Sequence, residues 1–326
     1  MAKREKTSKK SKNFPLFLKF LWRKKIEGIN FLLAFLVLIL LPARGYYSQV
    51  QAIWQSPKVQ SAHFVIPPLN PIPKNITGSV APQLSAKSAI VVDVPSGIIL
   101  YQKDPGLRLL PASTTKIMTA MVVLEGFLLD QVLEVPDFYK EGQNIELQKG
   151  EKLTVESLLD ALLVASANDA AEVFAANYPG GREKFIERMN KKAEDLNLFN
   201  THFVNPTGID EEGQYSSAAD LARLAKMAIQ NPKFIQIVST QEMTIYSVDQ
   251  KISHQMTNIN SLLGRIPGIR GIKTGWTEEA GECFVGFYEK DNRQIITVVL
   301  GSQDRFGETV QLIDWVFKNF GWEIPA

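Results

Sequence analysis

Strand-like patterns stand at both ends of the main body of this sequence, and helical patterns fill the middle. The segment "SAIVVDVPSGIILYQKD" (88–104) predicts two strands around the turn "PSG". The segment "ECFVGFYEKDNRQIITVVLGS" (282–302) predicts a second hairpin, which turns near Asp291 and Asn292. One sheet has to bring the two hairpins together. The predicted fold class is therefore α+β, an antiparallel sheet flanked by helices in three αβα layers, with an all-helical insertion.

The helical patterns show apolar residues at helical spacing. A buried helix is predicted over "PASTTKIMTAMVVLEGF" (111–127), and an amphipathic helix over "GETVQLIDWVFKNFG" (307–321) closes the chain. Four more helices are predicted between them: "TVESLLDALLVA" (154–165), "NDAAEVFAANY" (168–178), "GREKFIERMNKKAEDLNLF" (181–199) and "SSAADLARLAKMAIQ" (216–230). Five of the predicted helices therefore lie between the two hairpins, and the sixth follows the second hairpin.

The N-terminal region has the composition of an export signal. Residues 1–28 hold ten Lys/Arg and two acidic residues, a net charge of +8, so the rest of the +2 chain carries −6. They precede an apolar run, residues 29–43, that is short for a membrane span. We interpret 1–28 as a basic cytoplasmic tail and 29–45 as a cleaved signal sequence or a membrane anchor. Both interpretations place the body outside the cytoplasm, membrane-associated or secreted.

A proline-rich stretch follows, and several classes of function are disfavoured by composition. Six prolines fall within residues 46–85, which predicts an extended linker before a catalytic domain over 86–326. The mildly acidic body argues against nucleic acid as a partner. The single cysteine, Cys283, permits no disulfide within the chain and no Cys-rich metal site. We expect neither a metal nor a cofactor.

Three short motifs carry the chemistry. Ser113 and Lys116 form a Ser-x-x-Lys pair, whose spacing puts a hydroxyl and an amine on one face of a helix. Ser166-Ala167-Asn168 and Lys273-Thr274-Gly275 follow in that order. Each motif is weak alone, because a helix cap or a turn would explain it. Together they match the set found in penicillin-recognising enzymes, in which a lysine activates a nucleophilic serine.

From about residue 85 to 320 the chain resembles the low-molecular-mass penicillin-binding proteins, the serine D-alanyl-D-alanine carboxypeptidases. The similar segments are "PASTTKIMTAMVVLE", "LLVASANDAAE", "THFVNPTGID", "QYSSAADLARLA" and "GIKTGWTEEAGECFVG". The resemblance implies a β-lactamase/transpeptidase-like fold. It also implies that Ser113 is the nucleophile and Lys116 its base. One departure is Ala167, where these enzymes often have glycine.

The resemblance also implies roles for the remaining motif residues. Ser166 would relay a proton to the leaving group, and Asn168 would orient Lys116 and bind the substrate peptide. Lys273 and Thr274 would face the substrate carboxylate from an edge strand, where Gly275 permits close approach. Backbone N–H groups of Ser113 and Trp276 would form the oxyanion hole. Arg305 would help to hold the carboxylate.

The function implied is removal of the terminal D-Ala from peptidoglycan stem pentapeptides through an acyl-enzyme. The implied partners are the D-Ala-D-Ala stem peptide, β-lactams as covalent inhibitors, and the cytoplasmic membrane through the N-terminus. Three alternatives remain open: a DD-endopeptidase of the same family, a class A-like β-lactamase and a catalytically inactive wall-binding protein. A class A enzyme needs a Glu-x-x-Leu-Asn segment. In "AEDLN" (193–197), Glu194 is one residue too close to the leucine.

Overall fold

The structure is a computed structural model that describes residues 32–33, 36, 71–137 and 141–324. The chain divides into two units, Met1–Pro67 and Pro68–Ala326, and the fold below is that of the second. The predicted basic tail and most of the predicted signal or anchor (29–45) lie outside the described residues. Among the residues that are described, the structure has no helix with the length and apolar character needed to span a membrane.

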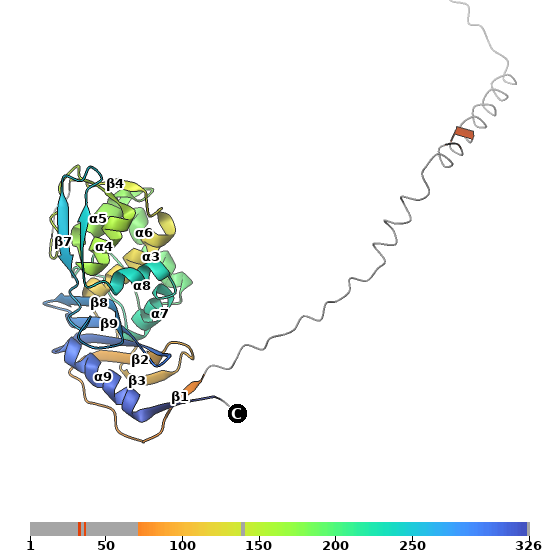
Figure 1. The fold of residues 1–326 in the computed structure, drawn as a ribbon, viewed down its shortest axis with the longest axis vertical. Helices are drawn as coiled ribbons and strands as arrows, with labels where there is room; N and C mark the ends of the chain where they lie inside the picture. Colours follow the sequence, from red (N-terminus) through yellow and green to blue (C-terminus); the bar gives the residue numbers. More distant parts are fainter. Residues whose placement is uncertain (1–31, 34–35, 37–70, 138–140, 325–326) are drawn as a thin grey trace, which may run out of the picture. The chain divides into compact units, whose positions relative to one another are not determined.

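The second unit is built on an antiparallel sheet of five strands in the order β3-β2-β10-β9-β8 (Figure 1). The strands are β2 (Ser88–Asp93), β3 (Ile99–Lys103), β8 (Ile269–Thr277), β9 (Gly281–Lys290) and β10 (Arg293–Ser302). β2–β3 and β9–β10 are the two predicted hairpins, and β2 pairs with β10. The prediction that one sheet joins the hairpins is therefore confirmed, and β8 is an edge strand.

Alternating side chains give this sheet two apolar faces, as a period of two residues requires. On β10, Ile296 and Val298 point into the apolar cluster on one side, while Ile295 and Val299 point into the cluster on the other. A central strand buried on both faces reads as a continuous apolar run. The sheet must therefore be covered by helices on both sides.

Helices supply both covers, which confirms the three-layer α+β prediction. One face packs against α9 (Arg305–Asn319), and the other packs against the helical block (Figure 1). That block consists of the short 3-10 helix η1 (Ala112–Thr115), α3 (Lys116–Gly126), α4 (Val155–Val164), α5 (Asn168–Asn177), α6 (Gly181–Asp195), α7 (Ala218–Ala228) and α8 (Pro232–Val238). The block and the edge strand β8 meet where η1 packs on β8.

Several elements lie outside the predicted set. They are α8 and three strand pairs: β1 (Ile72–Asn75) with β11 (Phe320–Glu323), β4 (Val132–Glu134) with β5 (Lys152–Thr154), and β6 (Glu242–Tyr246) with β7 (Ser253–Thr257). The β1–β11 pair shifts a predicted boundary, because β1 lies within the predicted linker (46–85). The end of that segment is part of the folded unit, and Pro73 is accommodated in a two-stranded sheet.

Candidate active site

Ser113 and Lys116 lie at the start of the buried helix that the sequence predicts. Ser113 is in η1, and Lys116 is the first residue of α3. Ala112, directly before the serine, has a φ of 48°, a left-handed conformation that non-glycine residues seldom adopt. The Lys116 Nζ atom lies 3.0 Å from Ser113 Oγ. The predicted pairing of hydroxyl and amine is therefore present in the structure.

The surroundings of Lys116 favour a neutral amine. Its side chain is completely buried, and Nζ also contacts two carbonyl oxygens, Asn168 Oδ1 at 2.5 Å and Thr207 O at 2.6 Å. Burial lowers the pKa of Lys116 well below its ordinary value, and the nearby Lys273 lowers it further, against a smaller opposing effect of nearby acids. A neutral amine donates to the two carbonyls, which only accept, and its lone pair then faces the Ser113 hydroxyl.

The second motif spans the junction of α4 and α5. Ser166 is buried and has a φ of 59°, another left-handed non-glycine residue beside the site. Asn168 begins α5, and its amide nitrogen donates to Glu141 O at 2.7 Å. That bond fixes which end of the amide faces Lys116. The motif thus presents one oriented carbonyl to Lys116 and one hydroxyl to Lys273.

The third motif lies on the edge strand β8. Lys273 Nζ donates to Ser166 Oγ over 2.8 Å, which joins the second and third motifs. Burial, with a smaller contribution from the charge of Arg305, lowers the pKa of Lys273 to about 7. A Cβ atom on Gly275 would lie 2.9 Å from Ser113 N, closer than real Cβ contacts allow. Glycine therefore permits the edge strand to approach Ser113.

Trp276 and Arg305 complete the predicted set. The Trp276 side chain is 62% exposed, and Arg305 Nη1 donates to Gly275 O over 2.8 Å. A cleft of about 550 Å³ is lined by six of the predicted residues: Ser113, Ser166, Thr274, Gly275, Trp276 and Arg305. Of the other three, Asn168 and Lys116 hydrogen-bond in a chain to Ser113, and Lys273 hydrogen-bonds to Ser166. The structure therefore brings all nine predicted residues together.

Sequence reasoning missed two contributors to this site. One is Thr207, whose carbonyl accepts from Lys116, and which lies in the "NPTGID" part of a segment cited for the resemblance. Its neighbour Gly208 has a φ of 87°, and a Cβ there would overlap Ala112 O at 1.9 Å. The other contributor is the segment 141–143, which lines the cleft and matches none of the three motifs.

Other candidate groups lie elsewhere. Burial raises the pKa of the Cys283 thiol to about 11, so it is protonated at neutral pH. Glu194, of the "AEDLN" segment, lies near the end of α6 beside Lys191 and is not among the residues that line the cleft. Within the described residues, no cluster of three or more His, Cys, Asp and Glu side chains is arranged to hold a metal ion.

The fold and the three joined motifs define the class of serine enzymes that recognise penicillin. Within that class, the family described as D-alanyl-D-alanine carboxypeptidase, peptidase S11, matches residues 75–304. The chain belongs to this family.

Named relatives agree with this assignment. The D-alanyl-D-alanine carboxypeptidase DacF of Bacillus subtilis is 36% identical over 248 residues, 72% of this chain, and the match spans 63% of DacF. A D-alanyl-D-alanine endopeptidase of Pseudomonas aeruginosa is 34% identical, over 75% of this chain and 81% of the relative. The ampicillin-bound penicillin-binding protein D2 of Listeria monocytogenes is similar in structure. It has a TM-score of 0.65 and 31% identity, covering 73% of this chain and all of that one.

Proposed function

We propose that this protein is a serine-type D-alanyl-D-alanine carboxypeptidase that removes the terminal D-Ala from peptidoglycan stem pentapeptides. One observation carries the proposal: a buried lysine amine lies 3.0 Å from the Ser113 hydroxyl and has carbonyl acceptors for its own hydrogens. That arrangement suits a base that removes the serine proton. Family membership and the names of the relatives support the substrate class.

In the proposed reaction, Ser113 Oγ attacks the carbonyl carbon of the penultimate D-Ala while Lys116 takes its proton. The tetrahedral oxyanion is stabilised by the backbone N–H groups of Ser113 and Trp276. The C–N bond then breaks, and the leaving D-Ala amine receives a proton through Ser166. Water hydrolyses the resulting ester, which releases the shortened peptide and restores Ser113.

In this proposal, the cationic side of the cleft binds the substrate carboxylate. Lys273 and Thr274 lie on the edge strand, and Arg305 lies beside Gly275. With a pKa of about 7, Lys273 is partly neutral in the free protein at neutral pH. A bound carboxylate would favour its charged form. Lys273 would therefore become fully charged when a substrate with a free C-terminus binds.

The test is to incubate the protein with a stem pentapeptide and measure free D-alanine by chromatography. Release by the wild type and none by Ser113→Ala supports the proposal. Because the Pseudomonas relative is named an endopeptidase, a cross-linked peptide dimer is assayed in parallel. Faster cleavage of the dimer than of the pentapeptide would favour the endopeptidase.

We also propose that the catalytic unit works outside the cytoplasm and is tethered or exported through residues 29–45. The ten cations before the apolar run support this orientation. The test of this orientation fuses a reporter after Ala326 and asks in which compartment the reporter is active. Activity only in the cytoplasm would contradict the proposal.

A further inference from the structure

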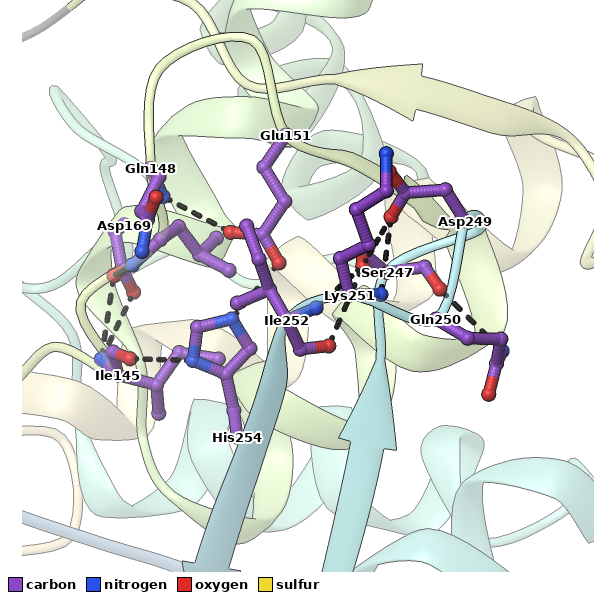
Figure 2. A network of polar contacts seen from close by, with 11 residues as sticks. Ile145, Gln148, Glu151, Asp169, Ser247, Asp249, Gln250, Lys251, Ile252 and His254 are labelled. Carbon is purple, nitrogen blue, oxygen red and sulfur yellow. Dashed lines mark hydrogen bonds and ion pairs between the residues drawn. The ribbon is translucent and has the colours of Figure 1, made fainter.

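A buried histidine outside the catalytic motifs bridges two parts of the fold. His254 lies on β7, and Figure 2 shows its ring between Glu151 and Ile145. The Nε2 atom lies 2.8 Å from a carboxylate oxygen of Glu151, and the Nδ1 atom lies 2.8 Å from Ile145 O. The Glu151 side chain is fully buried, so this contact is shielded from water. The residues 141–151 are called the site loop below.

Both ring nitrogens of His254 therefore face oxygen atoms that accept hydrogen bonds. A backbone carbonyl and an ionised carboxylate cannot donate, and a neutral imidazole carries hydrogen on only one nitrogen. Both contacts are hydrogen bonds when the pair is an imidazolium beside a carboxylate. If the pair loses that proton, one nitrogen lone pair faces an oxygen lone pair, and one of the two bonds is lost.

Ile145 connects this bridge to the catalytic centre. Its N–H donates to the Asp169 carboxylate over 3.2 Å, while its carbonyl accepts from His254 (Figure 2). Asp169 also accepts from Leu147 N. Asp169 follows Asn168 directly, and the site loop holds Asn168 itself.

The contacts of the site loop with Asn168 are all to the backbone of the loop. Asn168 N donates to Gln143 O over 2.7 Å, and Asn168 Nδ2 donates to Glu141 O over 2.7 Å. Gly142 lies so close that a Cβ atom would be 2.7 Å from Asn168 Nδ2. Since Asn168 Oδ1 contacts Lys116, the path from His254 to the catalytic base passes through this one loop.

Hydrogen bonds hold the β6–β7 hairpin, which carries His254, in place. Its turn is closed by Ser247 Oγ, which contacts Asp249 over 2.8 Å and accepts from Ile252 N (Figure 2). Val248 N also donates to Lys152 O, which ties the hairpin to β5. A displacement of the site loop is therefore resisted from the β6–β7 side.

We propose that His254 is a positioning residue: with Glu151, it holds the site loop so that Asn168 keeps Lys116 aligned with Ser113. This inference rests on the proposed function, since it concerns the speed of Ser113 acylation. The titratable and charged groups around His254 are Glu151 and Glu146 on the site loop, Asp169 on α5, and Asp249 and Lys251 at the hairpin turn. Both bonds of the bridge form together only when each ring nitrogen of His254 has a complementary hydrogen-bonding partner.

Two variants separate positioning from packing. His254→Ala removes both bonds. Glu151→Gln keeps both bonds with a neutral imidazole ring. The introduced amide oxygen still accepts from Gln148 N, and the amide nitrogen donates to one ring nitrogen of His254. The other ring nitrogen then donates to Ile145 O. Gln255→Ala, on the exposed face of the same strand, is the matched control. The second-order rate constant for acylation of the full chain by a fluorescent penicillin is measured for each variant, with melting curves as the folding control.

We expect His254→Ala to acylate about tenfold more slowly than wild type, since a shift of about 1 Å can slow a reaction by up to about a hundredfold. Glu151→Gln should acylate at a rate close to that of wild type, because both bonds to the ring are kept. The Glu151→Gln rate also tests the idea if His254→Ala does not fold. Gln255→Ala should match wild type.

Equal rates for His254→Ala and wild type, or a Glu151→Gln rate about tenfold below that of wild type, would overturn the positioning role. A wild-type protein that is not acylated at all would instead overturn the proposed function. The two failures are therefore distinguishable.

Discussion

Two lysines of the same charge occupy different environments in this site. Lys116 contacts Asn168 and Thr207 oxygens and the Ser113 hydroxyl, while Lys273 contacts Ser166, which lines the cleft. Burial is the main cause of the lowered pKa of both amines. The proposal requires Lys116 to be neutral and Lys273 to be charged, so the two residues should respond differently to the same substitution.

Lys116→Arg should abolish acylation by penicillin, because arginine stays protonated and cannot accept the serine proton. Lys273→Arg should retain part of the rate, because a guanidinium still binds a carboxylate. Acylation rates of the two purified variants decide the matter, with melting curves as the folding control. Equal rates for the two variants would mean that some group other than Lys116 is the base.

The same two lysines predict the pH dependence of kcat/KM, which reports the free enzyme. Loss of the Lys116 proton creates the base, so kcat/KM rises with pH until Lys116 is neutral. Loss of the Lys273 proton removes the cation, so kcat/KM falls above about pH 7. Lys273→Arg should remove the alkaline fall, since arginine does not titrate there. An alkaline fall that persists in Lys273→Arg would assign it to another group.

At the scale of elements, the sequence predicted what periodicity and motif chemistry encode. The apolar run "IITVVL" of β10 predicted a strand, and Ser-x-x-Lys at the start of an apolar helix predicted the contact between Ser113 and Lys116. Contacts through the backbone carry no such signal. Thr207 serves the site through its carbonyl oxygen, and any residue type could supply that atom.

The strands β1 and β11 escaped prediction for a different reason. β1 is only four residues long and contains Pro73, so its composition resembles that of the proline-rich stretch before it. Only pairing with a segment some 250 residues away makes it a strand. Long-range pairing of short segments leaves little local pattern in a sequence.

Truncation tests the role of this pair. Removal of residues 1–70 should leave the melting temperature of the catalytic unit close to that of the untruncated protein, because β1 is retained. Removal of residues 1–79 also removes β1 and the Thr77–Asn319 side-chain bond. We expect this to lower Tm by roughly 5 °C or more, since each kcal/mol shifts Tm by about 2–4 °C in a domain of this size. Equal Tm values would mean that the β1–β11 pair contributes nothing.

At the scale of the whole molecule, the sheet and the helical block both line the cleft that holds Ser113 and Ser166, and Lys273 reaches Ser166 from the edge strand. In the proposed function, the edge strand binds the carboxylate, and the helical block supplies the nucleophile and base. The glutamate of the "AEDLN" segment lies outside the residues that line the cleft. We therefore expect a penicillin to acylate this protein and to be released slowly, unlike in a class A β-lactamase.

Intact-mass spectrometry after incubation with benzylpenicillin tests the central claim most directly. The account predicts a single adduct of one penicillin per chain, located at Ser113 by peptide mapping. The adduct should still be present many minutes after the free drug has been removed. The adduct should be missing in Ser113→Ala, whose melting curve should match that of wild type. An adduct that forms equally in Ser113→Ala would show that Ser113 is not the nucleophile and would contradict the account.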